Sequence, residues 1–188
     1  MTLLVDKTHF AALGIVLALN LDESELARYI SQAQEFDIRP VLGDIFYYDL
    51  LENVADYDYE ALIEGGIDYE YQGYSYKFQF GLAAAICFYA YARYIPYANK
   101  KSTEMGLMQK RNEFSDHVDT KALQLMVNDS KSAAVGYLND VVLFLDRYRT
   151  VEPTKYTLWR RGGAPGLFGS DRSREPKPGQ KITKVGNI

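Results

Sequence analysis

The sequence predicts a mainly α-helical protein: a helical bundle with a central buried helix, one long C-terminal helix, a tyrosine- and acid-rich loop or hairpin, and an extended C-terminal arm. Residues 80–92 are uncharged and almost entirely apolar, apolar residues recur every three or four positions over 120–148, and the segment after 148 holds four of the six prolines. A chain of 188 residues with 47% hydrophobic content can bury one core. We therefore expect one helical domain over 1–148 and a basic arm over 149–188.

The first helix is predicted over residues 22 to about 37. Asp22 and Glu25 have the spacing of a capping box, in which each side chain accepts a hydrogen bond from the backbone N–H of the other residue. The apolar residues that follow have helical spacing: Leu26, Tyr29, Ile30, Ala33 and Phe36. This spacing gives the helix one face suited to burial.

A structural corner is predicted next, at Pro40, Gly43 and Asp44. Proline removes a backbone donor and biases Arg39 toward extended geometry, so the first helix should end before it. Gly43 permits backbone angles that other residues avoid, and Asp44 is a good N-cap for a second helix from Ile45 to about Val54. We expect a helix, a corner and a helix.

Two polar segments interrupt the helical pattern. Tyrosine and acid dominate residues 56–79, which contain Gly65, Gly66 and Gly73, and a loop or short hairpin is predicted there. Residues 97–119 are polar and predict a short exposed helix.

The central helix is predicted between Tyr76 and Ile95. This stretch is apolar on nearly all sides, which is typical of a helix surrounded by others. Its uncharged run of 13 residues is shorter than the roughly 20 that a membrane-spanning helix needs, and Arg93 and Pro96 close it. We expect a core helix and no membrane segment.

The most regular segment is 120–148. Apolar residues recur there at alternating spacings of three and four, with one serine among them: Leu123, Val127, Ser130, Ala134, Tyr137, Val141, Phe144 and Tyr148. A helix of this length is about 43 Å long. It should pack along its whole length.

Charge is distributed unevenly along the chain. Residues 21–70 hold 14 acidic side chains against Arg28 and Arg39, a net charge of −12, whereas residues 147–188 hold ten basic against three acidic, a net charge of +7. Such an uneven distribution of charge indicates what kind of partner the chain binds, but it does not indicate the fold. The basic end could meet nucleic acid or an acidic protein surface, including that of another copy.

Residues that could carry chemistry are few. His9 and His117 lie far apart without ligands at metal-binding spacing, and Cys87 sits in the apolar run, where a small buried residue is expected. The acidic groups Asp56, Asp58, Glu60, Asp68 and Glu70 lack the spacing of a calcium loop, which favours a solvated acidic face or a contact surface for a basic segment. Residues 162–170, GGAPGLFGS, lack the Lys-Ser or Lys-Thr of a phosphate-binding loop. We predict no catalytic residues, no metal and no cofactor.

Candidate partner contacts cluster after the long helix. Trp159, Arg160 and Arg161 combine an aromatic ring with two guanidinium groups, residue types enriched at interface hot spots. The full set of candidates is Arg147, Arg149, Tyr156, Trp159, Arg160, Arg161 and Phe168. The same residue types bind single-stranded nucleic acid by stacking and charge. Because the rest of the chain is acidic, protein contact is favoured.

A family resemblance accompanies these patterns. The stretch LDESELARYISQAQEFDIRPVLGDIFYYDLL resembles the N-terminal signature of head-tail connector (adaptor) proteins of tailed bacteriophages, especially those of Bacteroidetes hosts, including crAss-like phages. FQFGLAAAICFYAYARYI, YLNDVVLFLDRYR and KYTLWRRG continue the pattern, so the resemblance covers roughly residues 3–161. Beyond Gly162 no shared motif is found.

The resemblance implies a structural virion protein without catalysis. Such proteins form a homo-oligomer ring, typically of twelve copies, that docks on the portal protein, contacts further tail or ring proteins, and extends the channel through which DNA passes without specific binding. It also implies a place at the neck of the virion and, during assembly, in the host cytoplasm. Asp6 and Lys7 interrupt the N-terminus too early for a signal peptide, in keeping with a cytoplasmic product.

Two alternatives remain open. A helical nucleic-acid-binding accessory protein would use the basic segment 147–188. A small enzyme that uses the acidic, tyrosine-rich segment with a metal is the least favoured.

Overall fold

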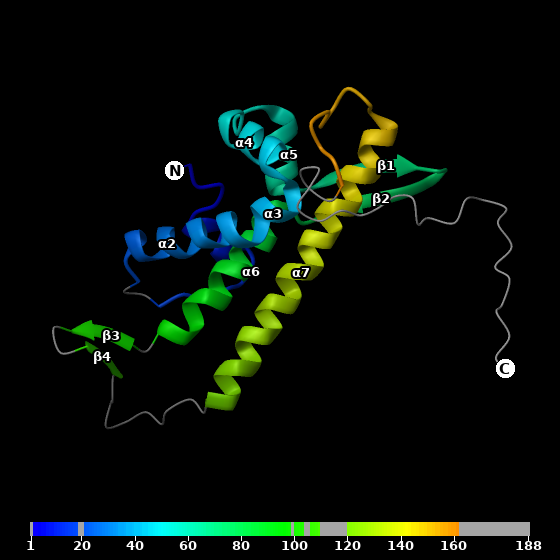
Figure 1. Ribbon diagram of the computed structural model, residues 1–188. Helices are drawn as coiled ribbons and strands as arrows, with labels where there is room; N and C mark the ends of the chain where they lie inside the picture. Colours follow the sequence, from blue (N-terminus) through cyan, green and yellow to red (C-terminus); the bar gives the residue numbers. More distant parts are fainter. Residues whose placement is uncertain (1, 19–20, 99, 104–105, 110–119, 162–188) are drawn as a thin grey trace, which may run out of the picture.

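A computed structural model describes residues 2–18, 21–98, 100–103, 106–109 and 120–161, and the side chains of 100–109 and Thr120 are not described. The fold is mainly α, with two short strand pairs (Figure 1). Its elements in chain order are α1 (Lys7–Ala12), α2 (Glu23–Ala33), the π-helical turn η1 (Gln34–Ile38), α3 (Arg39–Leu42), α4 (Asp44–Glu52), α5 (Tyr57–Glu64), β1 (Ile67–Tyr71), β2 (Tyr74–Phe78), α6 (Leu82–Tyr94), the 3₁₀ turn η2 (Ile95–Tyr97), β3 (Lys100–Thr103), β4 (Gly106–Gln109) and α7 (Thr120–Val151).

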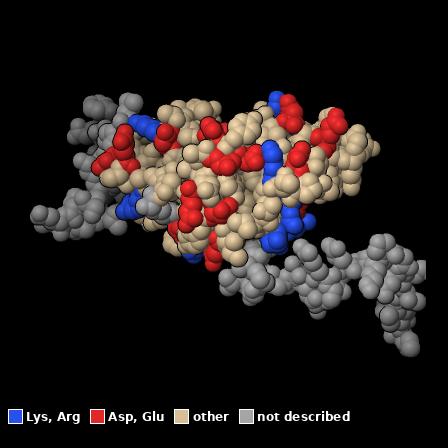
Figure 2. All heavy atoms as spheres, turned by 90° about the horizontal axis from the view of Figure 1, so that it is seen from above, with Lys and Arg blue, Asp and Glu red and all other residues tan. Residues whose placement is uncertain are grey.

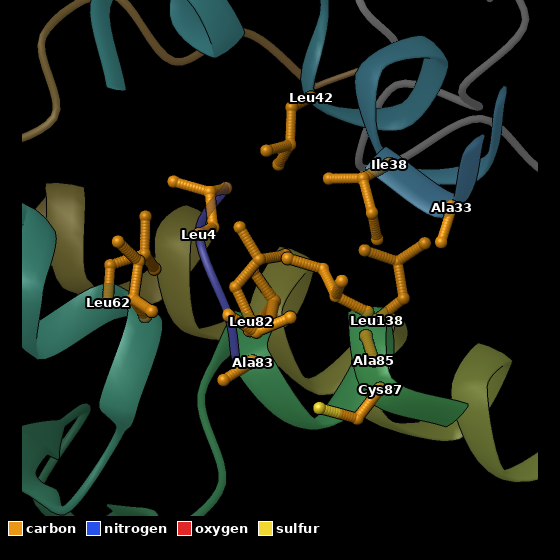
Figure 3. Packing of buried hydrophobic residues seen from close by; sticks show 14 of the residues in the cluster. Leu4, Ala33, Ile38, Leu42, Leu62, Leu82, Ala83, Ala85, Cys87 and Leu138 are labelled. Carbon is orange, nitrogen blue, oxygen red and sulfur yellow. The ribbon is translucent and has the colours of Figure 1, made fainter. Parts of the chain in front are cut away.

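The predicted central helix is α6, which begins at Leu82 rather than at Tyr76, because residues 76–78 belong to strand β2. It packs against α7 most extensively and also against α1, α2, η1 and α5. Its residues Leu82, Ala85 and Cys87 are fully buried. Figure 3 shows them with Leu138 from α7 and with Ala33 and Ile38 from residues 23–42, the helical stretch α2, η1 and α3 that we call the first helical arm. In the part of the chain that the structure describes, no helix is long and apolar enough to cross a membrane.

The first helix continues through the predicted corner. Asp22 is the N-cap of α2 as expected, but it accepts a hydrogen bond from the Ser24 N–H instead of forming the predicted capping box with Glu25. The helical backbone runs on to Leu42, and Arg39 is helical, with φ −53° and ψ −44°. A regular helix would bring the Pro40 ring against a carbonyl four residues earlier. The wider turn η1, in which the Arg39 N–H donates to the Gln34 carbonyl, shifts this register. The prediction that Pro40 ends the helix was therefore wrong.

The chain changes direction at Gly43 instead. Its φ of +80° and ψ of 147° lie in a region that is essentially reserved for glycine, in agreement with the predicted corner. Asp44 is the first residue of α4, Gly43 is its N-cap, and no side chain caps this helix. The prediction that Asp44 is the N-cap was wrong. Asp44 lies 3.7 Å from the Arg39 guanidinium.

The tyrosine- and acid-rich segment is half helix and half hairpin. Asp56 caps α5 by accepting a hydrogen bond from the Asp58 N–H, which corrects the expectation of a loop over residues 57–64. Strands β1 and β2 then form the antiparallel hairpin, with Tyr69 opposite Tyr76. The end of α5 touches the start of α6 closely, since a Cβ on Gly81 would lie 2.0 Å from the Ile63 carbonyl oxygen.

The segment between α6 and α7 differs from the prediction. Residues 100–103 and 106–109 pair as antiparallel strands, where an exposed helix was expected. His117 and residues 110–119 lie outside the described residues. The long helix α7 is confirmed, and its predicted stripe is buried or half-buried throughout, with Val127, Ala134, Val141 and Phe144 buried.

Residues 152–161 do not extend away from the body. After α7 the chain turns back over α4, α5 and the end of α7, and Tyr156 and Trp159 join the hydrophobic core (Figure 1). Packing therefore continues across the predicted boundary at 148/149 as far as Arg161. Residues 162–188 lie outside the described part of the chain.

Candidate functional site: the C-terminal plug, the acidic face and the hairpin hollow

Residues 152–161, here called the C-terminal plug, fill a gap between α4, α5 and α7 with two aromatic rings. Trp159 is 1% exposed and Tyr156 is 6% exposed. The Phe46 ring on α4 lies 5.7 Å from the Trp159 ring and 6.3 Å from the Tyr156 ring, all edge to face. Tyr59 on α5 lies 6.0 Å from Tyr156. The plug thus joins α4 and α5 to the end of α7.

Asp146 anchors one end of the plug. The Trp159 indole Nε1–H donates to its Oδ1 at 3.0 Å, and the Arg161 Nε lies 3.3 Å from its Oδ2. One turn further along α7, the Arg149 guanidinium donates to the Trp159 carbonyl at 2.9 Å. A buried indole N–H without a partner costs about 1–3 kcal/mol, so Asp146 makes the burial of Trp159 favourable.

Asp58 anchors the other end. The Tyr156 hydroxyl donates to the Asp58 carbonyl at 2.6 Å, and the Lys155 ammonium lies 2.8 Å from the Asp58 carboxylate. Burial raises the pKa of Tyr156, which keeps the hydroxyl a donor. Tyr156 has φ +50°, an uncommon conformation for a residue with a side chain. An acidic and a basic segment thus meet within one chain, whereas the sequence predicted such a contact with a partner or another copy.

These positions correct part of the predicted interface. Tyr156 and Trp159 are buried inside the chain rather than presented to a partner. Arg149 and Arg160 donate to backbone carbonyls of the plug, and Arg161 contacts Asp146. Phe168 lies outside the described residues. Sequence reasoning named Asp58 only as one of several acidic groups, and it missed Asp146, because no local pattern distinguishes this carboxylate from its neighbours on α7.

Arg147 is the candidate that lines an open space. A hollow of about 410 Å³, here called the hairpin hollow, lies between β1–β2 and α7. Its walls include Tyr69, Tyr76, Phe80, Tyr137 and Arg147. The Arg147 guanidinium lies over the Tyr76 ring, 4.3 Å from its centre, and among the described residues no carboxylate pairs with it.

The carboxylates of α4 and α5 form what we call the acidic face: Asp44, Asp49, Glu52, Asp56, Asp58, Glu60 and Glu64. Figure 2 looks down on this end of the molecule and shows acidic side chains spread across it. Large apolar side chains stand among them, since Tyr57 is 78% exposed and Ile45 is 64% exposed. A charged surface with exposed aromatic and aliphatic groups is suited to protein contact.

Among the described residues, His9 and Cys87 are the histidine and the cysteine, side chains that commonly take part in catalysis or metal binding. His9 bridges Asp6 at 2.8 Å and Glu64 at 2.9 Å through opposite ring nitrogens, so the two carboxylates do not converge. Within the described ranges, no group of three or more potential ligands is arranged to hold a metal ion. Burial raises the pKa of Cys87, which disfavours the nucleophilic thiolate.

A second hollow lies between α1 and α2. Its volume is about 680 Å³, and its apolar lining consists of Leu3, Val5, Ala11, Leu26, Ala27 and Ile30. Asp6, Lys7, Thr8 and Glu23 line it as well. Its lining is mostly apolar, and it also holds the Thr8 hydroxyl, which donates a hydrogen bond to the Asp6 carboxylate.

The described part of the chain is a small, mainly α-helical protein. The chain belongs to a family of unknown function (DUF6712), whose model matches residues 38–165. This match begins at the end of η1 and includes the whole C-terminal plug. No curated protein and no solved structure matches the chain.

Proposed function

We propose that this protein is a structural virion protein, a head-tail connector subunit that docks on the portal of a tailed bacteriophage and extends the DNA channel toward the tail. In this proposal identical copies form a ring, typically of twelve, and DNA passes through without specific binding. The protein has no catalytic role and is placed at the neck of the virion, after assembly in the host cytoplasm.

The observation that carries the proposal is the resemblance to connector proteins over residues 3–161. The segments that carry the resemblance occur along this chain in the following order: the first helical arm, the corner, the central helix, the long helix and the aromatic segment. The mainly helical fold and the contact-type surfaces support it, because a connector needs rigid elements and large surfaces rather than a catalytic centre.

The experiment is reconstitution with the portal protein encoded in the same phage genome. The purified chain and the portal are mixed, and the mass of the complex and its electron-microscopic class averages are measured. We expect a ring of this chain on the portal. A portal that stays bare while both proteins are folded contradicts the proposal. Tight DNA binding by the chain that falls steeply with salt would favour the alternative, a nucleic-acid-binding accessory protein that uses residues 147–188.

A further inference from the structure

The hairpin hollow combines two features of a recognition site. The first is a row of tyrosine rings, with Tyr69 and Tyr76 stacked 5.6 Å apart and Tyr137 on α7. The second is the Arg147 guanidinium, held over the Tyr76 and Tyr71 rings at 4.3 and 5.9 Å. An arginine fixed in this way loses little conformational freedom when it binds a carboxylate.

The charge in the hollow selects an acidic occupant. Arg147 and Lys77 both line it, against one carboxylate, Asp140. No ion pair joins Arg147 or Lys77 to any carboxylate that the structure describes. The hydroxyl of Tyr69 also raises the pKa of Arg147. The hollow is therefore a cationic site with aromatic walls in a chain whose net charge is −4.

The start of α5 has the complementary features. Tyr57 is 78% exposed, and Glu60 lies three residues later on the same side of the helix, also exposed. Glu60 pairs with no basic side chain of the described residues, whereas the neighbouring Asp58 is already paired with Lys155. Tyr57 and Glu60 are thus available as an aromatic group and a carboxylate.

We propose that the hairpin hollow of one copy receives the start of α5 from a second copy, with Tyr57 against the tyrosine walls and Glu60 paired with Arg147. The two surfaces are different patches of the chain, so the contact is heterologous. In a pair of copies, one hairpin hollow and one α5 start therefore remain free to bind further copies. Repetition of such a contact gives a ring when the rotation closes. The formation of a ring rests on the proposed connector function. The contact between two copies does not, because it requires no portal protein.

Charge reversal tests the contact. The mass of the full chain is measured by analytical ultracentrifugation over a range of concentrations for the wild type, Arg147→Glu, Glu60→Lys and an equimolar mixture of the two variants. We expect the wild type to self-associate and each variant alone to associate at least about tenfold more weakly, because like charges face each other. The mixture should regain association, since each interface between unlike copies then joins opposite charges.

Lys131→Glu is the matched control, because it makes the same charge change at an exposed position of α7 away from the hollow. It should associate like the wild type. Circular dichroism checks that each variant is folded, and recovery in the mixture is itself possible only for folded chains. A monomeric wild type, single variants that associate normally, or a mixture that stays dissociated overturns the inference.

The outcome is separable from that of the proposed function. A ring on the portal that forms equally well with Arg147→Glu retains the connector function and overturns this contact. Charge-dependent self-association without any portal binding supports the contact and contradicts the connector function.

Discussion

Trp159 is the residue on which the attachment of the C-terminal plug depends most. It is almost fully buried against Phe46, and its indole N–H has one partner, Asp146. Packing and hydrogen bonding therefore contribute separately, and two substitutions distinguish them.

We expect Trp159→Ala to lower the free energy of unfolding by about 3–5 kcal/mol, because it leaves a large cavity. Trp159→Phe keeps most of the packing and loses the hydrogen bond to Asp146, so a loss of about 1–2 kcal/mol is expected. Urea denaturation followed by circular dichroism measures both. Leu158→Ala, at an exposed neighbouring position, is the control and should change stability by less than about 0.5 kcal/mol. An alanine variant as stable as this control would contradict the role given to Trp159.

His9 is the residue whose protonation links two distant segments. Partial burial disfavours the charged imidazolium, but hydrogen bonds and charge from Glu64 and Asp6 outweigh it, and the pKa of His9 is raised above 6.5. The pKa of Asp6 is lowered to about 2, mainly through its hydrogen bond with the Thr8 side chain, so Asp6 stays ionised near neutral pH. The imidazolium thus holds α1 to the end of α5.

A raised pKa in the folded state means that this stabilisation is fully present below the unfolded pKa and is lost as pH rises through the folded value. We therefore expect wild type to exceed His9→Gln in stability by more at mildly acidic than at mildly alkaline pH. The difference should stay under about 1 kcal/mol, since both carboxylates are exposed. Denaturation midpoints of the two proteins at several pH values measure it, and an unchanged difference across the range would contradict the prediction.

At the scale of elements, one π-helical turn and one glycine set the direction of α4 relative to the first helical arm. The turn η1 allows the helix to continue past Pro40. It also leaves Phe36 at the surface, where the Arg93 guanidinium lies 5.7 Å from the centre of the Phe36 ring. Gly43 then reverses the backbone so that Phe46 and Tyr47 enter the core. The corner decides which side chains of α4 are buried.

Gly43→Val should lower the free energy of unfolding by about 1–3 kcal/mol and misdirect α4, because a β-branched residue tolerates this backbone conformation poorly. Gly136→Ala is the contrasting variant, since Gly136 lies in the middle of α7 with open space around its Cβ position. It should raise stability by about 0.5–1 kcal/mol. Thermal unfolding monitored by circular dichroism measures both, and a Gly43→Val protein of wild-type stability would show that the corner does not need glycine.

At the scale of the whole molecule, the C-terminal plug joins the hydrophobic core by packing against α4, α5 and α7. It supplies the rings that cover Phe46 and Tyr59, and its basic side chains contact Asp58 and Asp146. The family match that ends at residue 165 includes it. The packed body therefore extends past Tyr148 and includes residues as far along the chain as Arg161.

Truncation tests this limit. A chain of residues 1–161 should unfold at nearly the same urea concentration as the full chain, because the core contacts described here are all retained. A chain of residues 1–151 loses Tyr156 and Trp159 together and should be less stable by more than about 3 kcal/mol. Circular dichroism measures both unfolding curves. Equal stability of the two truncated chains would place the plug outside the folded body.

The sequence by itself determined the helical class, the central helix, the long helix, the hairpin and the need for Gly43. These features follow from local patterns: apolar periodicity, uncharged runs, capping residues and glycine. The sequence also showed that acidic and basic residues are concentrated in different parts of the chain, because charges can be counted directly from the residue types.

Tertiary structure alone decided the π-helical turn before Pro40, the helix α5 and the burial of the C-terminal plug. The plug depends on residues distant in sequence: Trp159 is buried against Phe46 and donates to Asp146, and Lys155 pairs with Asp58, 97 residues away. A segment with little periodicity gives no local sign of such contacts, since its apolar area is covered by other elements rather than by its own. Most of the residues predicted to contact a partner therefore contact other parts of the same chain, whereas Arg147 lines the open hairpin hollow.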